Sequence, residues 1–261
     1  MPYFERVVTA GKVVEVKKFF SSRMGRKGGS RKGWETPTEE KAKEVNERKA
    51  VDKLRWLMFE NFKKGDGHII LTYRKKQGLE EAKKALDSFT RKMRRKCQKL
   101  GLVFKYIVVT EHKSGRTHHH MIAEKGLFDL IAEVWGENGA ARVTYITGYE
   151  HLANLAEYFV KETRKTFQEK DSPYRKRWNA STNLKRWKEE IREVSANSWR
   201  LKPKPTRKIR GKRYYLDQSV GNGAGVLNYE CTFTGLPCQF YRLYPLELKE
   251  KQKRKSMKKK E

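Results

Sequence analysis

Apolar residues along the middle of the chain follow two different spacings. Compact runs rich in β-branched and aromatic residues are typical of β-strands, whereas apolar residues that recur every three or four positions predict helices with one buried face. We expect strands at residues 68–73, 104–110, 121–123 and 141–147, and helices at 79–100, 127–135 and 149–165. These elements follow one another in the order β-α-β-β-α-β-α.

The two strands in the middle of this order form a predicted hairpin. They flank a Gly-containing turn at residues 113–116, and the second strand carries three consecutive histidines at residues 118–120. The order fits an α+β fold, namely a split βαβ or ferredoxin-like antiparallel sheet with helices on one face. The histidines then lie on a central strand of the sheet.

The flanking segments have weaker patterns. We expect a strand at 11–16, a basic loop at 21–33, a helix from a hydroxyl N-cap in 36–39 to about residue 62, a helix at 185–194, and strands at 212–216 and 229–234. The almost wholly charged end should be disordered. The predicted parts are an N-terminal strand, basic loop and helix (1–64), a central domain (65–190), a C-terminal extension (191–248) and a basic tail (249–261).

Charge indicates the partner. The 261 residues include 61 Lys and Arg against 31 Asp and Glu, a formal net charge of +30. Such a field concentrates polyanions, so nucleic acid is the expected partner. A membrane is not expected, because no apolar run approaches the ~20 residues that span a bilayer. Three cysteines are too few and too irregular for a disulfide framework, which favours a reducing cytosol.

The helix at 79–100 has one strongly basic face. Its cations are Lys83, Lys84, Arg91, Lys92, Arg94, Arg95, Lys96 and Lys99. A solvated face is the ordinary interpretation of such charges, and phosphate contact is the alternative. For contact with DNA we select Lys92, Arg95 and Lys96 on this helix, together with Lys165 and Arg177 further along the chain.

The histidine strand offers a candidate metal site. Because side chains alternate along a strand, His118 and His120 point to one face and His119 to the other. The partner strand brings Glu111 to the same end of the hairpin as a third ligand. Imidazole nitrogen and carboxylate oxygen suit Mn²⁺, Mg²⁺ or Zn²⁺. The alternative is an exposed histidine run that binds no metal.

A tyrosine on the helix at 149–165 supplies a candidate nucleophile. Tyr158 lies to the side of the apolar stripe of this helix, and Lys161, three residues on, is its surface neighbour. A phenol has an ordinary pKa near 10, so attack on phosphorus needs help. A divalent ion would polarise the phosphate, and Lys161 would favour the phenolate and hold the phosphate. A boundary tyrosine with a satisfied hydroxyl is the alternative.

These motifs together resemble the HUH endonuclease superfamily, and within it the single-tyrosine rolling-circle replication initiators of phages, plasmids and integrative elements. The matching stretches are residues 69–73, 115–121 and 158–161, and residues 177–184 also resemble a family segment. The resemblance covers about residues 65–185. Two positions depart from the family pattern: His119 stands where a bulky hydrophobe is usual and could displace one ligand, and Thr117 stands where Pro is frequent.

The resemblance implies a metal-dependent, site-specific endonuclease and strand transferase for single-stranded DNA. Tyr158 would be the nucleophile that becomes a 5′-phosphotyrosine, with His118, His120 and Glu111 as ligands of Mn²⁺ or Mg²⁺. It would open and rejoin a replication origin in the cytoplasm of a prokaryotic host, alongside the host helicase and polymerase. The rivals are a single-tyrosine transposase or relaxase, and a non-catalytic nucleic-acid-binding protein.

Overall fold

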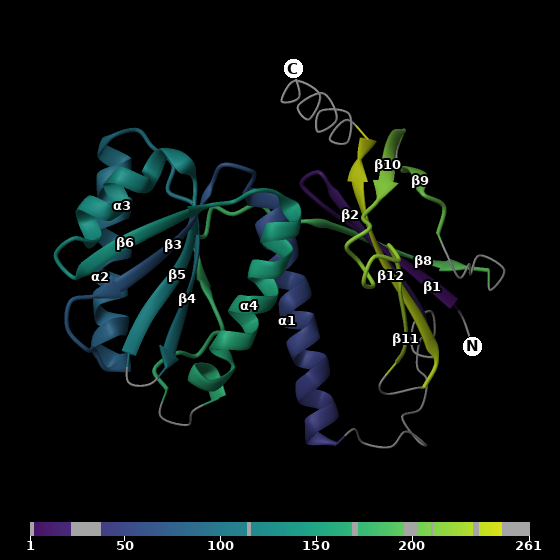
Figure 1. Ribbon diagram of the computed structural model, residues 1–261, viewed down its shortest axis with the longest axis horizontal. Coiled ribbons are helices and arrows are strands. Elements are labelled where there is room, and N and C mark those ends of the chain that lie inside the picture. Colours follow the sequence, from purple (N-terminus) through teal and green to yellow (C-terminus); the bar gives the residue numbers. More distant parts are fainter. Residues whose placement is uncertain are drawn as a thin grey trace. The chain divides into compact units, whose positions relative to one another are not determined.

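The computed structural model describes residues 3–21, 38–113, 116–168, 172–195, 203–209, 211–231 and 235–246, with the backbone alone at 113 and 165–168. Its contacts divide the chain into two compact units (Figure 1). One consists of Met1–Arg48 together with Trp187–Glu261, and the other is Lys49–Arg186. The predicted loop at 21–33, beyond Ser21, and the predicted tail at 249–261 lie outside the described residues.

The unit Lys49–Arg186 contains a five-stranded antiparallel sheet, sheet B, in the order β6-β3-β5-β4-β7. Its elements are the end of α1 (Glu39–Asn61), β3 (Gly67–Tyr73), α2 (Leu79–Lys99), β4 (Tyr106–Lys113), β5 (Arg116–Ala123), a 3-10 turn (Lys125–Leu127), α3 (Phe128–Trp135), β6 (Gly139–Tyr145), α4 (Tyr149–Gln168) and β7 (Asn179–Ala180). The α+β class and the order from β3 to α4 are confirmed, and the histidine strand β5 is central.

Helices cover both faces of sheet B, which differs from the expected single face. On one face, Phe89 and Met93 of α2 and Trp135 of α3 form a buried core with the strands. On the other, Phe159 of α4 contacts strand residues such as His68 and His120. Both faces of the strands carry apolar side chains, so both need a cover. Figure 1 shows α2 and α3 on one side of the sheet and α4 on the other.

The segment at 177–184 closes one edge of sheet B. Strand β7 pairs with β4 through Asn179 and Ala180. Next to it, the Ser181 hydroxyl accepts a hydrogen bond from the Tyr106 amide at 3.1 Å, and the Ser181 amide donates to the Tyr106 carbonyl at 3.0 Å. Asn183 donates to the Phe104 carbonyl at 3.3 Å. This segment therefore satisfies backbone groups that the edge strand β4 would otherwise expose.

The other unit contains a seven-stranded sheet, sheet A, built from both ends of the chain. The strands run in the order β8-β1-β2-β12-β10-β9, with β11 also paired to β12. Their bounds are β1 (Tyr3–Ala10), β2 (Val13–Phe20), β8 (Lys188–Val194), β9 (Thr206–Ile209), β10 (Lys212–Leu216), β11 (Leu227–Glu230) and β12 (Pro237–Pro245). The strand expected at 212–216 is confirmed, and the one expected at 229–234 begins earlier, with 232–234 outside the described residues.

The prediction for residues 185–194 fails, whereas the predicted start of α1 agrees with the structure. The predicted helix at 185–194 is wrong, because residues Lys188–Val194 form strand β8, paired along its length with β1. Pairing with β1, which lies 179 to 191 residues away in sequence, overrides the local helix preference of its Lys and Glu residues. Helix α1 begins at Glu39, where Thr38 caps it by accepting a 3.4 Å hydrogen bond from the Lys41 amide. Thr36 and Pro37 lie outside the described residues.

Candidate metal centre

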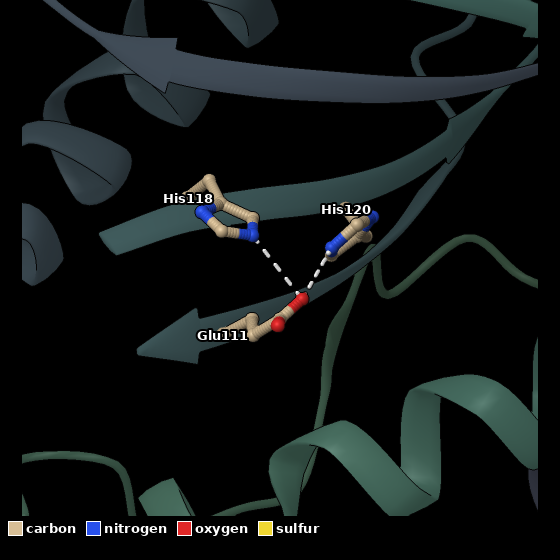
Figure 2. Close-up of side chains that lie close together, drawn as sticks. All are labelled: Glu111, His118 and His120. Atoms are coloured by element: carbon tan, nitrogen blue, oxygen red, sulfur yellow. Dashed lines mark hydrogen bonds and ion pairs between the residues drawn. The ribbon is translucent and has the colours of Figure 1, made fainter. Parts of the chain in front are cut away.

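The register of the β4–β5 hairpin brings the predicted ligands together. Glu111 on β4 is directly opposite His118 on β5, and Val109 is opposite His120. Side chains two residues apart on a strand share a face, so Glu111, His118 and His120 project from the same side of sheet B. Figure 2 shows the three side chains pointing toward one another from these two strands.

One carboxylate oxygen is the meeting point of the group. Glu111 Oε2 lies 3.2 Å from His118 Nε2 and 2.9 Å from His120 Nε2 (Figure 2). The ligand atoms of the three residues all lie within 4.8 Å of one another. Two imidazole nitrogens and one carboxylate oxygen form a donor set that divalent ions accept, so the chemistry of the group fits a metal ion.

The Glu111 carboxyl is buried yet ionised. Burial alone would raise its pKa, but the hydrogen bond with His120, the charges of both histidines and the bond from Tyr158 outweigh it, and the pKa of Glu111 lies below its usual value. Burial and His118 together hold the pKa of His120 below the usual value despite the contact with Glu111. A carboxylate beside a neutral imidazole is the protonation state that a metal ion requires of its ligands.

His119 is not part of the group. It is fully buried on the opposite face, where its Nε2 lies 2.7 Å from the Tyr73 hydroxyl and its Nδ1 2.9 Å from the Thr110 hydroxyl. Burial lowers the pKa of His119 to about 3, so the ring is neutral. The possibility that His119 displaces a ligand does not agree with this geometry, because the ring is held in the core by two hydroxyls.

His68 on β3 supports the group, a contact that the sequence interpretation missed. Its Nε2 lies 3.0 Å from His120 Nδ1, and the two rings stack with centroids 5.2 Å apart. Burial, followed by the nearby His120 and His151, lowers the pKa of His68 to about 4. A neutral His68 can accept a hydrogen bond from His120 Nδ1–H, and in that tautomer His120 Nε2 carries the lone pair that a metal ion would bind. The sequence did contain a sign of this role, because His68 is a polar residue at the start of an otherwise apolar strand.

Tyr158 reaches the same carboxylate oxygen from α4. Its hydroxyl donates to Glu111 Oε2 at 3.2 Å, and its ring contacts the His120 ring with centroids 5.4 Å apart. The side chain remains 38% exposed, so a substrate has access to it. Burial first, and the Glu111 charge second, raise the pKa of Tyr158 to about 12. Lys161, one turn further along α4, is exposed.

The residues predicted to bind DNA have different surroundings. Lys92 pairs with Glu137, and Lys96 with Glu133 of α3. Arg95 is exposed, and Arg177 donates weakly to the Val160 carbonyl at 3.5 Å. The side chain of Lys165 lies outside the described residues. Lys92, Arg95 and Lys96 belong to α2, which covers the face of sheet B opposite the three candidate ligands.

No described helix is both long and apolar enough to cross a membrane, and the three cysteines are free thiols.

No curated protein and no solved structure matches the chain. Residues 67–167 match the family model of the replication-associated protein ORF2/G2P. This stretch runs from β3 to the end of α4 and includes the hairpin, the candidate ligands and Tyr158. The chain therefore contains a domain of the replication-associated protein ORF2/G2P family, an HUH-type family of rolling-circle replication initiators, and this domain carries the His-Glu-His group.

Proposed function

We propose that this chain nicks single-stranded DNA at a replication origin and later rejoins it, with Tyr158 as the nucleophile. The observation that carries the proposal is the position of Glu111 Oε2, which contacts both candidate histidine ligands and the Tyr158 hydroxyl. A phenol within reach of a candidate metal group is the arrangement that tyrosine-mediated phosphoryl transfer needs.

In this proposal Glu111, His118 and His120 hold Mn²⁺ or Mg²⁺. The bound ion would polarise a phosphate oxygen and stabilise charge on the leaving oxygen. With the ion bound, His68 would accept a hydrogen bond from His120 Nδ1–H and so keep His120 in the tautomer whose Nε2 carries a lone pair. Binding of a cation at Glu111 would also offset the negative charge that contributes to the raised pKa of Tyr158.

The reaction at Tyr158 conserves the phosphodiester energy. The hydroxyl loses its proton and its oxygen attacks phosphorus, forming a tyrosine 5′-phosphodiester while the bond to the 3′ oxygen breaks and releases a 3′-hydroxyl. In the reverse direction a 3′-hydroxyl attacks the phosphotyrosine and releases the phenol. Lys161 would neutralise phosphate charge beside Tyr158. The host helicase and polymerase would unwind the DNA and extend the released 3′ end in the host cytoplasm.

The basic residues would hold the DNA during these steps. Arg95, Lys165 and Arg177 are proposed to contact the phosphate backbone, as are Lys92 and Lys96. For the two lysines, phosphate would have to replace the glutamates that they contact in this structure. Such contacts fix the position of the DNA and read no bases.

The test is formation of a covalent adduct on single-stranded origin DNA from the replicon that encodes the chain. Protein, labelled DNA and Mn²⁺ are incubated and resolved on denaturing gels beside Tyr158→Phe and Tyr145→Phe. Tyr145 is a matched control, because it is an exposed tyrosine on β6 of the same unit. We expect an adduct from the wild type and Tyr145→Phe, and none from Tyr158→Phe or with EDTA.

Other outcomes would redirect the proposal. An adduct that persists in Tyr158→Phe would place the nucleophile elsewhere. DNA binding that survives EDTA, without any adduct or nick on the cognate origin, would identify a non-catalytic nucleic-acid-binding protein.

A further inference from the structure

Helix α2 presents its cations in two different environments. Lys96 forms an ion pair with Glu133 of α3, and Lys92 forms one with Glu137, which follows α3. Arg91, Arg94 and Arg95 are exposed, and Lys83 is half-buried. No carboxylate among the described residues forms an ion pair with any of these four cations. The helix therefore separates cations that already have acidic partners from cations that do not.

The four cations without acidic partners line a continuous groove. Two adjoining hollows of about 560 and 490 Å³ share Arg91 and Arg94. The first is bounded by α2, β4 and β7 and includes Lys83 and Asn179, and the second includes Arg95. Asp87 is the one carboxylate among the lining residues, so the groove has a large positive excess.

Contacts in the protein hold two of the guanidinium groups in place. Arg94 Nη2 donates to the Tyr106 hydroxyl at 2.9 Å, and Arg91 Nε donates to the Asp87 carbonyl at 3.3 Å. Neither contact neutralises charge, and each leaves other N–H donors of the guanidinium for a ligand. Planar guanidinium groups match phosphate oxygens in two-point hydrogen bonds, so the groove suits phosphate groups.

The groove is long enough for several phosphates. Lys83 and Arg95 are 12 residues apart on one helix, which corresponds to ~18 Å at ~1.5 Å per residue. One strand of B-form DNA carries a phosphate about every 3.4 Å along the axis, so roughly five fit this length. A single nucleotide or inorganic phosphate would leave most of the cations without a partner.

The groove and the metal group lie on opposite faces of sheet B. Tyr106 and Val108 of β4 line the groove, whereas Glu111 of the same strand belongs to the metal group. Tyr106 and Val108 pack in the core with α2, and His120 packs against Phe159 of α4. Substitutions in the groove should therefore leave the chemistry of the metal group intact.

We propose that this α2–β7 groove is a separate binding site for the DNA phosphate backbone, which anchors DNA on the face of sheet B opposite the nicking site. Recognition there is by charge and spacing, without base readout. The inference rests on the proposed function in taking DNA as the ligand. It adds a second site, whose cations Lys83, Arg91 and Arg94 lie outside the set selected from the sequence.

The test measures how salt weakens DNA binding. Fluorescence anisotropy with an oligonucleotide of arbitrary sequence is followed between about 50 and 200 mM salt in EDTA, which removes any contribution of the metal. The groove variant is Arg91→Ala/Arg94→Ala, because both cations line both hollows and neither is among the residues proposed above to hold the DNA during nicking. The control is Lys63→Ala/Lys64→Ala, two exposed cations just before β3 whose removal changes the net charge equally. Circular dichroism verifies that both variants fold.

The groove variant should lose at least about tenfold in affinity at the lowest salt. The slope of log K against log salt should become shallower by about 1.4 for single strands or about 1.8 for duplex, the effect of two lost phosphate contacts. The control should keep the wild-type slope. Equal losses of DNA affinity in the groove and control variants would show that the net charge of the protein attracts DNA without a defined site. An unchanged salt slope in the groove variant would also contradict the proposed site. If inorganic phosphate displaced the oligonucleotide at an equal concentration of phosphate groups, the groove would be a site for single anions and not for DNA.

Nicking assays separate the two proposals. At saturating origin DNA the groove variant should still form the Tyr158 adduct. If the wild type forms no adduct while the groove variant loses binding, the nicking function fails and the groove stands. If the wild type nicks and the groove variant binds DNA normally, the groove fails and the nicking function stands.

Discussion

At the scale of single residues, the site depends on the alternation of side chains along β5. Consecutive histidines have opposite roles: His118 and His120 meet Glu111, while His119 is fixed in the core by Tyr73 and Thr110. A shift of register by one residue would exchange these environments, exposing a ring that now fills the core. The hydroxyls that hold His119 thus help to fix which histidines join Glu111 in the candidate metal group.

His68 is expected to position His120 for metal binding. In His68→Phe the ring volume remains, but the acceptor for His120 Nδ1–H is lost, so the affinity for Mn²⁺ should fall about tenfold. Isothermal titration calorimetry at neutral pH measures the affinity. His68→Gln supplies a carbonyl acceptor and should recover most of the loss. Wild-type affinity in His68→Phe would show that the stacked rings, and not the hydrogen bond, orient His120.

The candidate ligands and Tyr158 could be predicted from the sequence because each prediction used a local rule. The hairpin fixes which residues lie opposite each other, and its period of two fixes the shared face of Glu111, His118 and His120. Helical spacing placed Tyr158 beside the apolar stripe, where its hydroxyl reaches Glu111. His68 required knowledge of which strand is the next neighbour of β5, and local patterns do not contain that information.

At the scale of elements, local sequence patterns described two features of the sheets least well. These are the helices that cover each face of a sheet and the segments that pair with its edge strands. Compact runs of β-branched and apolar residues predicted the main strands of sheet B and their order along the chain, whereas the placement of α4 on the second face depends on long-range packing. The segment at 177–184 gave no periodic signal because it works through backbone hydrogen bonds to β4. Strand β8 was mistaken for a helix for a related reason: its partner β1 is at the other end of the chain.

Ser181 is expected to stabilise the unit that contains sheet B. Its hydroxyl accepts from the buried Tyr106 amide at 3.1 Å, so Ser181→Ala leaves that amide without this acceptor. The free energy of unfolding should fall by about 1–3 kcal/mol, as measured by urea denaturation. Thr182→Ala changes an exposed neighbour and serves as the control, with a change of less than about 0.5 kcal/mol. Equal effects of the two substitutions would argue against a role of the hydroxyl in closing the edge.

At the scale of the whole molecule, the chain ends combine into one sheet. Strand β1 pairs with β8, and β2 pairs with β12, and both partners follow the family-model match at 67–167 by twenty residues or more. Local hydrophobic patterns located several of these strands and could not show that they pair. The domain division predicted from the sequence kept residues 1–64 and 191–248 apart, whereas the contacts group most of both segments into one unit.

Ion pairs of buried carboxylates connect strands of this sheet that are far apart in the sequence. Glu5 on β1 accepts hydrogen bonds from Arg192 on β8 at 2.7 Å and Arg207 on β9 at 2.9 Å. In the core of the same unit, Arg242 on β12 bonds Glu15 on β2 at 2.9 Å and Asp217 at 3.2 Å. Removing one member of such a network leaves a buried charge without its partner, which is costly. Each network therefore stabilises the pairing of distant strands only while all of its charged side chains are present.

The Glu5 network predicts a specific dependence of stability on pH. Burial raises the pKa of Glu5, but the bonds and charges of Arg207 and Arg192 outweigh it, so its pKa in the folded protein lies below the ordinary value. The unfolded chain then binds a proton more readily than the folded one. The stabilisation is therefore complete above the unfolded pKa of about 4.3 and disappears as pH falls through the lower, folded value. Glu5→Gln should reduce the free energy of unfolding by about 1–3 kcal/mol at pH 7.

Urea denaturation of wild type and Glu5→Gln at a series of pH values from 7 to 3 measures this contribution. The difference between the two proteins should be constant from pH 7 to about 5 and should shrink below pH 4, because protonation makes the wild-type side chain as neutral as glutamine. Other groups that titrate in this range affect both proteins alike and cancel in the difference. A difference that stays constant to pH 3 would mean that the contacts of Glu5 with Arg192 and Arg207 stabilise the sheet through shape and not through charge.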